Sequence, residues 1–361
     1  MLPPRPASVD PSAATGDTST ERGRRLLVVR LSAIGDIVHT LPAAAALAEA
    51  RYEVIWAVQP GGLPLVASNP AVAATVTVPA RRPFRPRAIS QAIHALKASQ
   101  VATALDLQGL WKSALWTRAS GAGRRIGWNA AARREPASAM LLTERRALPA
   151  SAVHVLDKNL ALLAALGIDA IGRRDFPLPP RAREAARVDR ELAVLGLERP
   201  VLLHPGGGWS SKLWPPELYG ELASRLARRG IPTLVSWGPD ELGLAERVVA
   251  ASGGTAIPCF ACGLLEFAAL AGRARAIVAA DTGPLHLACA VGLPAVALFG
   301  PTDPARNGPW NPADRVLSRR PPCFPCHRRE CATHRGVLGS LPAEEVEQAL
   351  LERIGLADAA R

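Results

Sequence analysis

Short runs of apolar residues alternate along the chain with longer segments in which apolar residues recur at helical spacing. In the first half the apolar runs occupy 25–31, 52–58, 74–80 and 101–107, and the helix-like segments occupy 36–50, 86–100 and 111–120. Strands that are apolar throughout and separated by helices are typical of a parallel sheet covered on both faces. The pattern therefore predicts a doubly wound α/β lobe.

The same alternation begins again after a helix-like segment at 181–197. An apolar run at 199–208 opens it, and the next elements are helices at 214–230, 240–252 and 283–292 and strands at 232–238, 274–280 and 294–300. We therefore expect two doubly wound lobes, at 25–185 and 195–340. A C-terminal helix within 341–361 follows, with Val346, Leu350 and Ile354 on one face.

The composition shows that the protein is strongly basic. The chain has 361 residues and a formal net charge of +12, which comes from several arginine clusters. Such a surface favours polyanions: nucleic acid, anionic lipid headgroups or phosphorylated substrates. Residues 1–24 lack the apolar core of a signal peptide and are expected to form a disordered N-terminal extension. No stretch reaches the roughly 18–20 apolar residues of a membrane span. We therefore expect a cytoplasmic protein that can rest on a membrane surface without crossing it.

Three of the six cysteines fall in the segment CFPCHRREC, at Cys323, Cys326 and Cys331. A CxxC pair followed by Cys and His has zinc-ligand spacing, but only one such cluster is present. We favour a structural loop with thiols or a local disulfide, and a metal site is the alternative. The other cysteines, at Cys259, Cys262 and Cys289, lie in apolar contexts and are expected to be packing residues.

Four loops that follow strands have a composition suited to chemistry. They are SAIGD at 32–36, DLQGLWKS at 106–113, HPGGGWSSKLW at 204–214 and ADTGPLH at 280–286. Ligands of open parallel sheets bind beyond the carboxyl ends of the strands, against helix N-termini. In the third loop, glycines and serines including Gly207 and Ser210 allow close approach of an anion, and Lys212 adds a positive charge. The alternative is a turn with a solvated lysine.

The loop at 280–286 is a second anion-friendly site in the same lobe. Asp281 or Thr282 would cap the following helix, and the amides of Thr282 and Gly283 would face a cleft. In the simpler interpretation Asp281 is only a cap and His286 a packed residue. Two such loops favour a nucleotide diphosphate, and the lack of G-x-G-x-x-G disfavours a redox dinucleotide fold. Asp36 in the first lobe is then a candidate base, although it could serve only as a helix cap.

These motifs carry a resemblance to a known family. The segments RLSAIGDIVHTLPA, DLQGLWKSAL, RREP followed by HVLDKN, KLWP, and DTGPLHLACAVGLPAVALFGPTDP resemble those of the lipopolysaccharide core heptosyltransferases, the ADP-heptose-using members of glycosyltransferase family nine. The resemblance runs from about Arg25 to the C-terminal helix. It implies a GT-B fold, in which two Rossmann-like lobes face each other across a cleft and the C-terminal helix packs back toward the first lobe.

The resemblance also implies a mechanism and roles for residues. It implies metal-independent, inverting transfer, with Asp36 as the catalytic base and Lys212 at the donor phosphates. Asp281, Thr282, Gly283 and His286 match the donor loop, and Glu241 matches a glutamate at the nucleotide ribose. We place Gly207 and Ser210 on the donor side as well. On the acceptor side we place seven residues: Ser32, His39, Arg81, Arg82, Arg85, Lys112 and Arg134.

The implied reaction moves L-glycero-D-manno-heptose from ADP-heptose to the Kdo of Kdo-lipid A. ADP-heptose is a donor substrate, and no cofactor is expected. The arginines would meet the acidic acceptor at the cytoplasmic face of the inner membrane. A different acceptor or another nucleotide sugar is the alternative within the family. A nucleic-acid-binding protein is disfavoured, because aromatic residues make up only 4% and no nucleic-acid motif is present.

Overall fold

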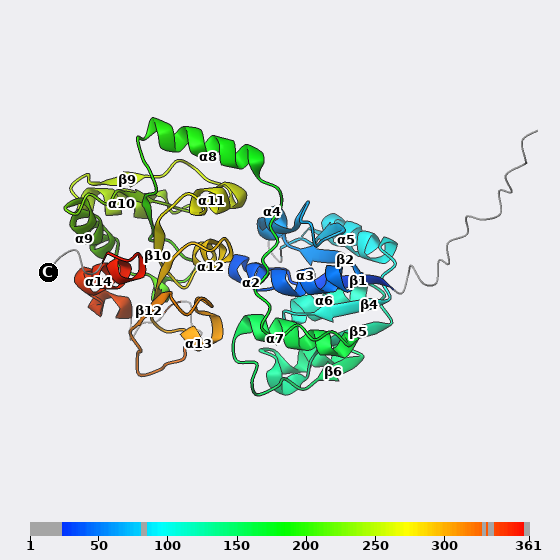
Figure 1. Ribbon diagram of the computed structural model, residues 1–361. Helices are drawn as coiled ribbons and strands as arrows, with labels where there is room; N and C mark the ends of the chain where they lie inside the picture. The colour runs from blue at the N-terminus through cyan, green and yellow to red at the C-terminus, as the bar shows by residue number, and fades with distance from the viewer. Residues whose placement is uncertain (1–23, 81–84, 327–329, 331–335, 357–361) are drawn as a thin grey trace, which may run out of the picture.

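The computed structural model describes residues 24–80, 85–326, 330 and 336–356. These residues form two lobes, each built on a six-stranded parallel sheet (Figure 1). The strands of the first sheet lie in the order β3-β2-β1-β4-β5-β6, in which sequential numbering reverses direction between β1 and β4. Their bounds are β1 Arg25–Val29, β2 Glu53–Val58, β3 Ala74–Thr77, β4 Thr103–Asp106, β5 Arg124–Trp128 and β6 Glu144–Arg146.

The second sheet has the order β12-β11-β10-β7-β8-β9, with its reversal between β10 and β7. Its strands are β7 Val201–His204, β8 Thr233–Val235, β9 Ala256–Pro258, β10 Ala276–Ala280, β11 Ala295–Phe299 and β12 Arg315–Ser318. The expected doubly wound α/β architecture is confirmed. The hydrophobic pattern missed β5, β6, β9 and β12. These are edge or near-edge strands that are short or carry charged residues, so they lack the apolar run of a central strand.

Helices cover the faces of both sheets. Those that precede the second sheet are α2 Ile34–Val38, α3 Leu41–Glu49, α4 Leu63–Val66, α5 Pro86–Ala98, α6 Trp111–Ala119, α7 Val155–Ala161 and α8 Ala182–Val194. Those that follow are α9 Pro216–Ala227, α10 Leu242–Ala251, α11 Leu264–Ala271, α12 Gly283–Ala290, α13 Pro304–Asn307 and α14 Ala343–Arg353. The helix-like segment at 36–50 is divided at His39 and Thr40 into α2 and α3, with Pro42 in the first turn of α3.

The two lobes meet where α2 packs against α12, at the centre of Figure 1. The two helices can approach this closely because each has a glycine at the contact. A β-carbon added at Gly283 would lie 2.8 Å from Cβ of Ile34, and one added at Gly35 would overlap the ring of His286. Because α2 follows β1 and α12 follows β10, this contact brings together the two points at which the strand order reverses. Such points are where ligands bind in open α/β sheets.

The C-terminal helix does not pack where the family resemblance implied. α14 packs against α9 and against β11 and β12, and in Figure 1 it lies on the side of the second lobe that faces away from the first. Val346 and Leu350 are fully buried there in the core of the second lobe, and Ile354 packs against the same core. The expected packing toward the first lobe is therefore wrong for the described part of this helix. The remaining domain limits stay a prediction.

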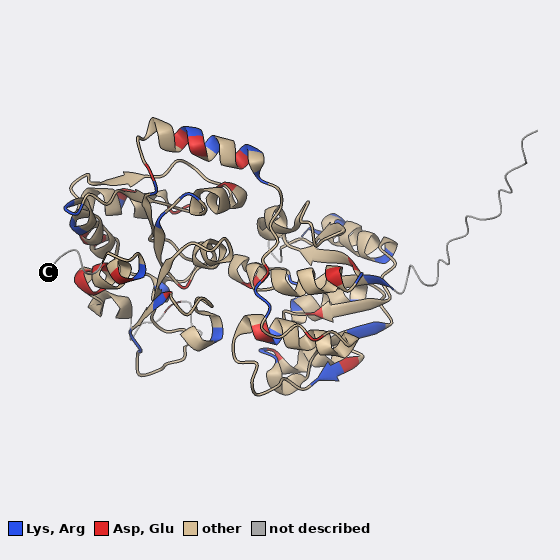
Figure 2. Cartoon of the chain, in the orientation of Figure 1, with Lys and Arg blue, Asp and Glu red and all other residues tan. Residues whose placement is uncertain are grey.

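Charged residues are spread over both lobes, and basic and acidic residues alternate along α8 (Figure 2). This helix connects the lobes and packs on α11, where Arg187 pairs with Glu266 and Arg273 pairs with Asp189. Among the described residues, no helix combines the length and the apolar character that crossing a membrane requires. The predicted extension at residues 1–24 lies outside the described residues, except for Arg24.

Candidate active site

A cleft of about 580 Å³ opens between the lobes at their contact. The first lobe lines it with residues that follow β1, β4 and β5 and with residues of α7. The second lobe lines it with residues that follow β7, β10 and β11. Of the predicted site residues, those on the cleft wall are Asp36, His39, Arg134, Lys212, Asp281, Thr282, Gly283 and His286. The carboxylate and the anion-friendly loops that the sequence placed on different lobes therefore share one cavity.

Asp36 lies in the first turn of α2 and faces this cleft, with 36% of its side chain exposed. Ala33 is the N-cap residue, and its backbone N–H donates to Oδ2 of Asp36 over 3.4 Å. Asp36 therefore satisfies the helix terminus from the third helical position rather than as the N-cap itself. Its other oxygen, Oδ1, lies 4.0 Å from Nη1 of Arg30. The carboxylate is held by weak contacts and stays accessible to a substrate.

Arg30 was not predicted as a site residue, although it interrupts an otherwise apolar run. Its guanidinium is buried, and it donates from Nε to Oγ1 of Thr40 over 3.2 Å and from Nη2 to Oδ1 of Asn159 over 2.8 Å. Burial lowers the pKa of Arg30, and the nearby carboxylate of Asp36 opposes that effect. These bonds place a cation beside Asp36. An arginine within an apolar run of the sequence was the available signal.

Asp281 is the centre of a buried polar network. It accepts hydrogen bonds from Nζ of Lys212 at 2.5 Å, from Thr302 at 2.7 Å and from Asn307 at 2.5 Å, and it lies 3.2 Å from Nε2 of His286. Burial alone would raise the pKa of this carboxyl, but the partners His286 and Lys212 outweigh burial and hold its pKa well below the usual range. Asp281 is therefore ionised, and several side chains of the second lobe share it as a hydrogen-bond acceptor. The interpretation of Asp281 as only a helix cap is wrong, since Thr282 is the N-cap residue of α12.

Thr282 is the N-cap residue of α12, without a side-chain capping bond. Its hydroxyl is buried and has no hydrogen-bond partner among the described residues, and the same holds for Nδ1 of His286. Buried polar atoms without partners cost free energy unless something else satisfies them. Both residues line the cleft.

Lys212 stands opposite α12 on the loop after β7. Its ammonium group pairs with Asp281 and lies 4.4 Å above the centre of the Trp209 ring. The side chain is 15% exposed, at the cleft wall. Lys212 therefore presents one positive charge to the cavity from a position that Asp281 and Trp209 define.

The remaining donor-side predictions lie beside the cleft wall rather than on it. Glu241 accepts the backbone N–H groups of Gly207 at 2.9 Å and Gly238 at 2.8 Å, and it lies against His204. A side chain at Gly206 would overlap the Glu241 carboxylate. Glu241 thus holds two glycine loops together here. Ser210 is exposed in a short 3₁₀ turn, Ser210–Lys212, and is not among the described residues that line the cleft.

His204, which lies against Glu241, is expected to make the stability of the protein depend on pH. Burial lowers its pKa to about 4, although the carboxylate of Glu241 acts in the opposite direction. An unfolded histidine has a pKa of about 6.5. Between that pH and the folded pKa the folded protein binds fewer protons than the unfolded one, so its stability falls as the pH falls. We expect this residue to account for a loss of about 2 kcal/mol in the free energy of unfolding between pH 7 and pH 5.

Urea denaturation at both pH values tests this expectation. In His204→Asn, the decrease in the free energy of unfolding between pH 7 and pH 5 should be smaller by about 2 kcal/mol, because the titrating imidazole is absent. His94→Asn is the control, because His94 is exposed on α5. Equal pH dependence in the wild type and in His204→Asn would contradict the assignment.

On the acceptor side, the structure brings together only some of the predicted residues. His39 is 2% exposed, and its ring centre lies 4.4 Å from that of His286. Burial and the neighbouring His286 hold its pKa well below the usual range. Arg134 is exposed at the cleft wall. Ser32 and Lys112 are joined by a hydrogen bond of 2.8 Å beside the cleft, without lining it.

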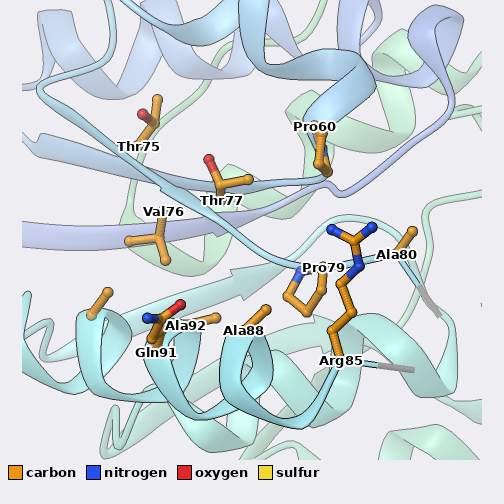
Figure 3. Close-up of a pocket in the computed structure, with 11 residues that line it drawn as sticks. Pro60, Thr75, Val76, Thr77, Pro79, Ala80, Arg85, Ala88, Gln91 and Ala92 are labelled. Carbon is orange, nitrogen blue, oxygen red and sulfur yellow. The ribbon is translucent and has the colours of Figure 1, made fainter. Parts of the chain in front are cut away.

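Arg85 lies elsewhere. It borders a separate pocket of about 600 Å³ between β3 and α5, where Figure 3 shows it near Pro79 and Ala80 and opposite Pro60. Arg85 is therefore not on the wall of the cleft, and its contact with the acceptor stays a prediction. Arg81 and Arg82 lie outside the described residues.

The cysteine predictions have mixed outcomes. Cys323 is exposed and Cys326 is half-buried, and Cys331 lies outside the described residues. Within the part of the chain that the structure describes, no group of three or more His, Cys, Asp or Glu side chains is placed to hold a metal ion. Cys259 and Cys289 are buried as expected, and Cys262 is half-buried with its sulfur 3.8 Å from that of Cys259.

Several residues of the cleft wall were not predicted from the sequence. Thr302 and Asn307 complete the Asp281 network, and Lys158 and Arg306 bring further positive charge. Lys158 lies in the HVLDKN segment and Thr302 in the GPTDP segment, so the motifs themselves were the available signal.

Comparison with known proteins identifies the family. Residues 89–335 match the model of glycosyltransferase family 9 (heptosyltransferase). The chain is 33% identical over 321 residues to lipopolysaccharide heptosyltransferase 1 of Pseudomonas aeruginosa, covering 85% of this chain and 87% of that protein.

Solved structures agree with this match. The structure of E. coli heptosyltransferase WaaC with ADP-2-deoxy-2-fluoro heptose has a TM-score of 0.70 and 26% identity, with coverage of 90% of this chain and 98% of that one. A family 9 glycosyltransferase from Veillonella parvula is alike in fold, with a TM-score of 0.77 at 18% identity and coverage of 92% and 97%. The chain therefore belongs to glycosyltransferase family 9, the heptosyltransferase family, and is a glycosyltransferase of the GT-B fold.

Proposed function

We propose that this enzyme transfers L-glycero-D-manno-heptose from ADP-heptose to the Kdo of Kdo-lipid A, with inversion at the anomeric carbon. One observation carries the proposal: Asp36 of the first lobe and Lys212 with the α12 terminus of the second lobe line the same cleft. A base and an anion-binding loop on opposite walls are what such a transfer needs. The relatives named above, a lipopolysaccharide heptosyltransferase 1 and a heptosyltransferase with an ADP-heptose analogue, support the choice of substrates.

The second lobe is the donor side of this proposal. The diphosphate of ADP-heptose lies at the N-terminus of α12, where backbone N–H groups and the helix dipole favour negative charge. Lys212 neutralises part of that charge and stabilises the departing ADP. Thr282 and His286, which line the cleft beside this terminus, supply further contacts. Glu241 and the loop with Gly207 and Ser210 lie beside this region, at the nucleoside end of the donor.

The first lobe supplies the base. The acceptor hydroxyl transfers its proton to the Asp36 carboxylate, and its oxygen forms a bond to the anomeric carbon of the heptose. The bond between that carbon and the diphosphate oxygen breaks on the opposite face, and ADP leaves with the electron pair. Arg30 keeps a positive charge beside Asp36 before the proton arrives. ADP-heptose is a substrate, and the proposal includes no cofactor and no metal.

The acceptor approaches from the side of the first lobe. Arg134 on the cleft wall meets an acidic group of the acceptor in this proposal. His39 on the cleft wall and the pair of Ser32 and Lys112 beside it are further proposed acceptor-side residues. A net charge of +12 favours peripheral contact with an anionic membrane surface at the cytoplasmic face. Arg81, Arg82 and Arg85 stay proposed acceptor contacts, and Arg85 borders a pocket that is separate from the cleft.

Lys212→Ala tests the donor side. We expect the affinity for ADP, measured by calorimetry, to fall about 10- to 100-fold, because a charged contact to phosphate is lost. Arg247→Ala is a matched control in the same lobe, since Arg247 pairs with Glu217 on the exposed surface. Unchanged ADP affinity in Lys212→Ala would remove the lysine from the phosphate site.

Mass spectrometry of the products tests the whole reaction. The enzyme is incubated with ADP-heptose and Kdo-lipid A, with and without a heptose already attached to the acceptor. One added heptose on the unmodified acceptor alone is the expected result. Addition only to the acceptor that already carries heptose would replace the proposed acceptor by that of another family member, and failure to use ADP-heptose would replace the donor.

A further inference from the structure

A second contact joins the lobes, between α7 of the first and α13 of the second. His154, the N-cap residue of α7, bridges it through Nε2, which lies 3.0 Å from the carbonyl oxygen of Gly308 just after α13. Nδ1 of the same ring accepts the backbone N–H of Leu156 over 3.1 Å. A neutral ring with its proton on Nε2 satisfies both bonds, so His154 holds the two helix ends together.

Each of these helices brings a cation to the cleft wall. Lys158 lies one turn after His154, on the same face of α7, and is half-buried. Arg306 lies in α13, two residues before the glycine that His154 contacts. Neither side chain has a hydrogen bond or an ion pair with any residue that the structure describes.

This sets the two residues apart from most other cations of the cleft. Lys212 pairs with Asp281, Arg133 with Asp106, and Arg30 stands beside Asp36. Burial lowers the pKa of Lys158, and the positive charge of Arg306 lowers it further. Lys158 is half-buried and Arg306 is exposed on the same cleft wall. Their like charges repel each other, and an anion bound by both would offset that repulsion.

We propose that Lys158 and Arg306 form a binding site for one anionic group of a substrate, contributed jointly by the two lobes. The identity of the group rests on the proposed function: it is either a phosphate of the donor or a carboxylate of the acceptor. Because one cation comes from each lobe, the bound anion attracts both and favours the closed arrangement of the cleft. The site differs from the α12 terminus, which the second lobe forms alone.

The test uses the full chain and the variants Lys158→Met, Arg306→Met and their combination. Affinity for ADP is measured by calorimetry, and affinity for free Kdo by NMR titration. We expect one of the two affinities to fall about 10- to 100-fold in each single variant. The double variant should lose less than the product of the single losses, since both cations contact one anion. Loss for ADP assigns the site to the donor, and loss for Kdo assigns it to the acceptor.

Thermal unfolding without ligand distinguishes this role from a structural one. Each single methionine variant is expected to raise Tm by on the order of 1 °C, because the repulsion between the two cations is relieved. The same variants are expected to bind the anion more weakly, and a structural role would not raise Tm. Lys158→Arg should retain most of the affinity, because it keeps the charge. Lys97→Met, at an exposed lysine of α5, should change neither property.

The proposal is overturned if both affinities stay within about twofold of the wild type in both single variants. It is also overturned if Lys158→Arg binds as weakly as Lys158→Met. These measurements depend on binding rather than turnover. If the product analysis finds no transfer to Kdo-lipid A but the affinity losses occur, the proposed function fails and the anion site stands.

Discussion

The Asp36→Asn variant is expected to keep its affinity for ADP and to lose about 10²- to 10⁴-fold in kcat for heptose transfer. Asparagine has the shape of aspartate, so the bond from the Ala33 N–H is retained. It cannot accept the proton of the acceptor hydroxyl, and that proton is released as the new bond forms. In the proposed mechanism, donor binding depends on the second lobe and does not involve this side chain.

Single-turnover kinetics with ADP-heptose, together with calorimetry of ADP, check this expectation. Glu53→Gln is the matched control, because Glu53 is an exposed carboxylate of the same lobe that pairs with Arg25 away from the cleft. Its transfer rate should stay within about twofold of the wild type. Full turnover by Asp36→Asn would mean that another group accepts the proton.

Asp281→Ala is expected to lower the free energy of unfolding by about 3–5 kcal/mol, the cost of removing one partner from a buried charged network. Lys212 loses its anion, and Thr302 and Asn307 lose their acceptor, all at buried or nearly buried positions. Urea denaturation at pH 7 measures the change. The affinity for ADP should fall as well, because Lys212 is no longer held in place.

The effect should depend on pH in a defined direction. The folded pKa of Asp281 lies below that of an unfolded aspartate, about 3.9, so its stabilisation is complete above that value. It is lost as the pH falls through the folded pKa, and wild type and variant should approach each other in acid. Asp175→Ala is the control, since that exposed carboxylate pairs with Arg173 at the surface and should cost about 1 kcal/mol or less. Equal stabilities of Asp281→Ala and Asp175→Ala would contradict the central role of Asp281.

The hydrophobic pattern predicted the central strands and most of the helices because each buries a continuous apolar run or face. It missed strands such as β6, whose three residues are all charged. β6 adopts an extended conformation because it pairs with β5. The residues of β6 alone do not indicate that pairing. The C-terminal helix shows the same limit. Its apolar face was evident from Val346 and Leu350, but the lobe it covers was predicted wrongly.

The sequence likewise predicted some features of the site and not others. Motif spacing placed Asp36, Lys212 and Asp281 among the site residues, because each follows a strand at a loop of unusual composition. It did not separate Arg134, which lines the cleft, from Arg85, which borders another pocket. Both are basic residues in arginine-rich segments, and only the path of the chain after β3 and β5 distinguishes them.

By itself, the sequence determined the two-lobed α/β architecture, the family and the residue types of the cleft, since these depend on local periodicity and on contiguous motifs. The tertiary structure decided which charges meet. Arg30 reaches Asn159, 129 positions away, and Lys158 and Arg306, from different lobes, line the same cleft. Hydrogen bonds and charge interactions act over a few ångströms in space whatever the separation along the chain. Their partners are therefore set only when distant segments of the chain pack together, within each lobe and between the two.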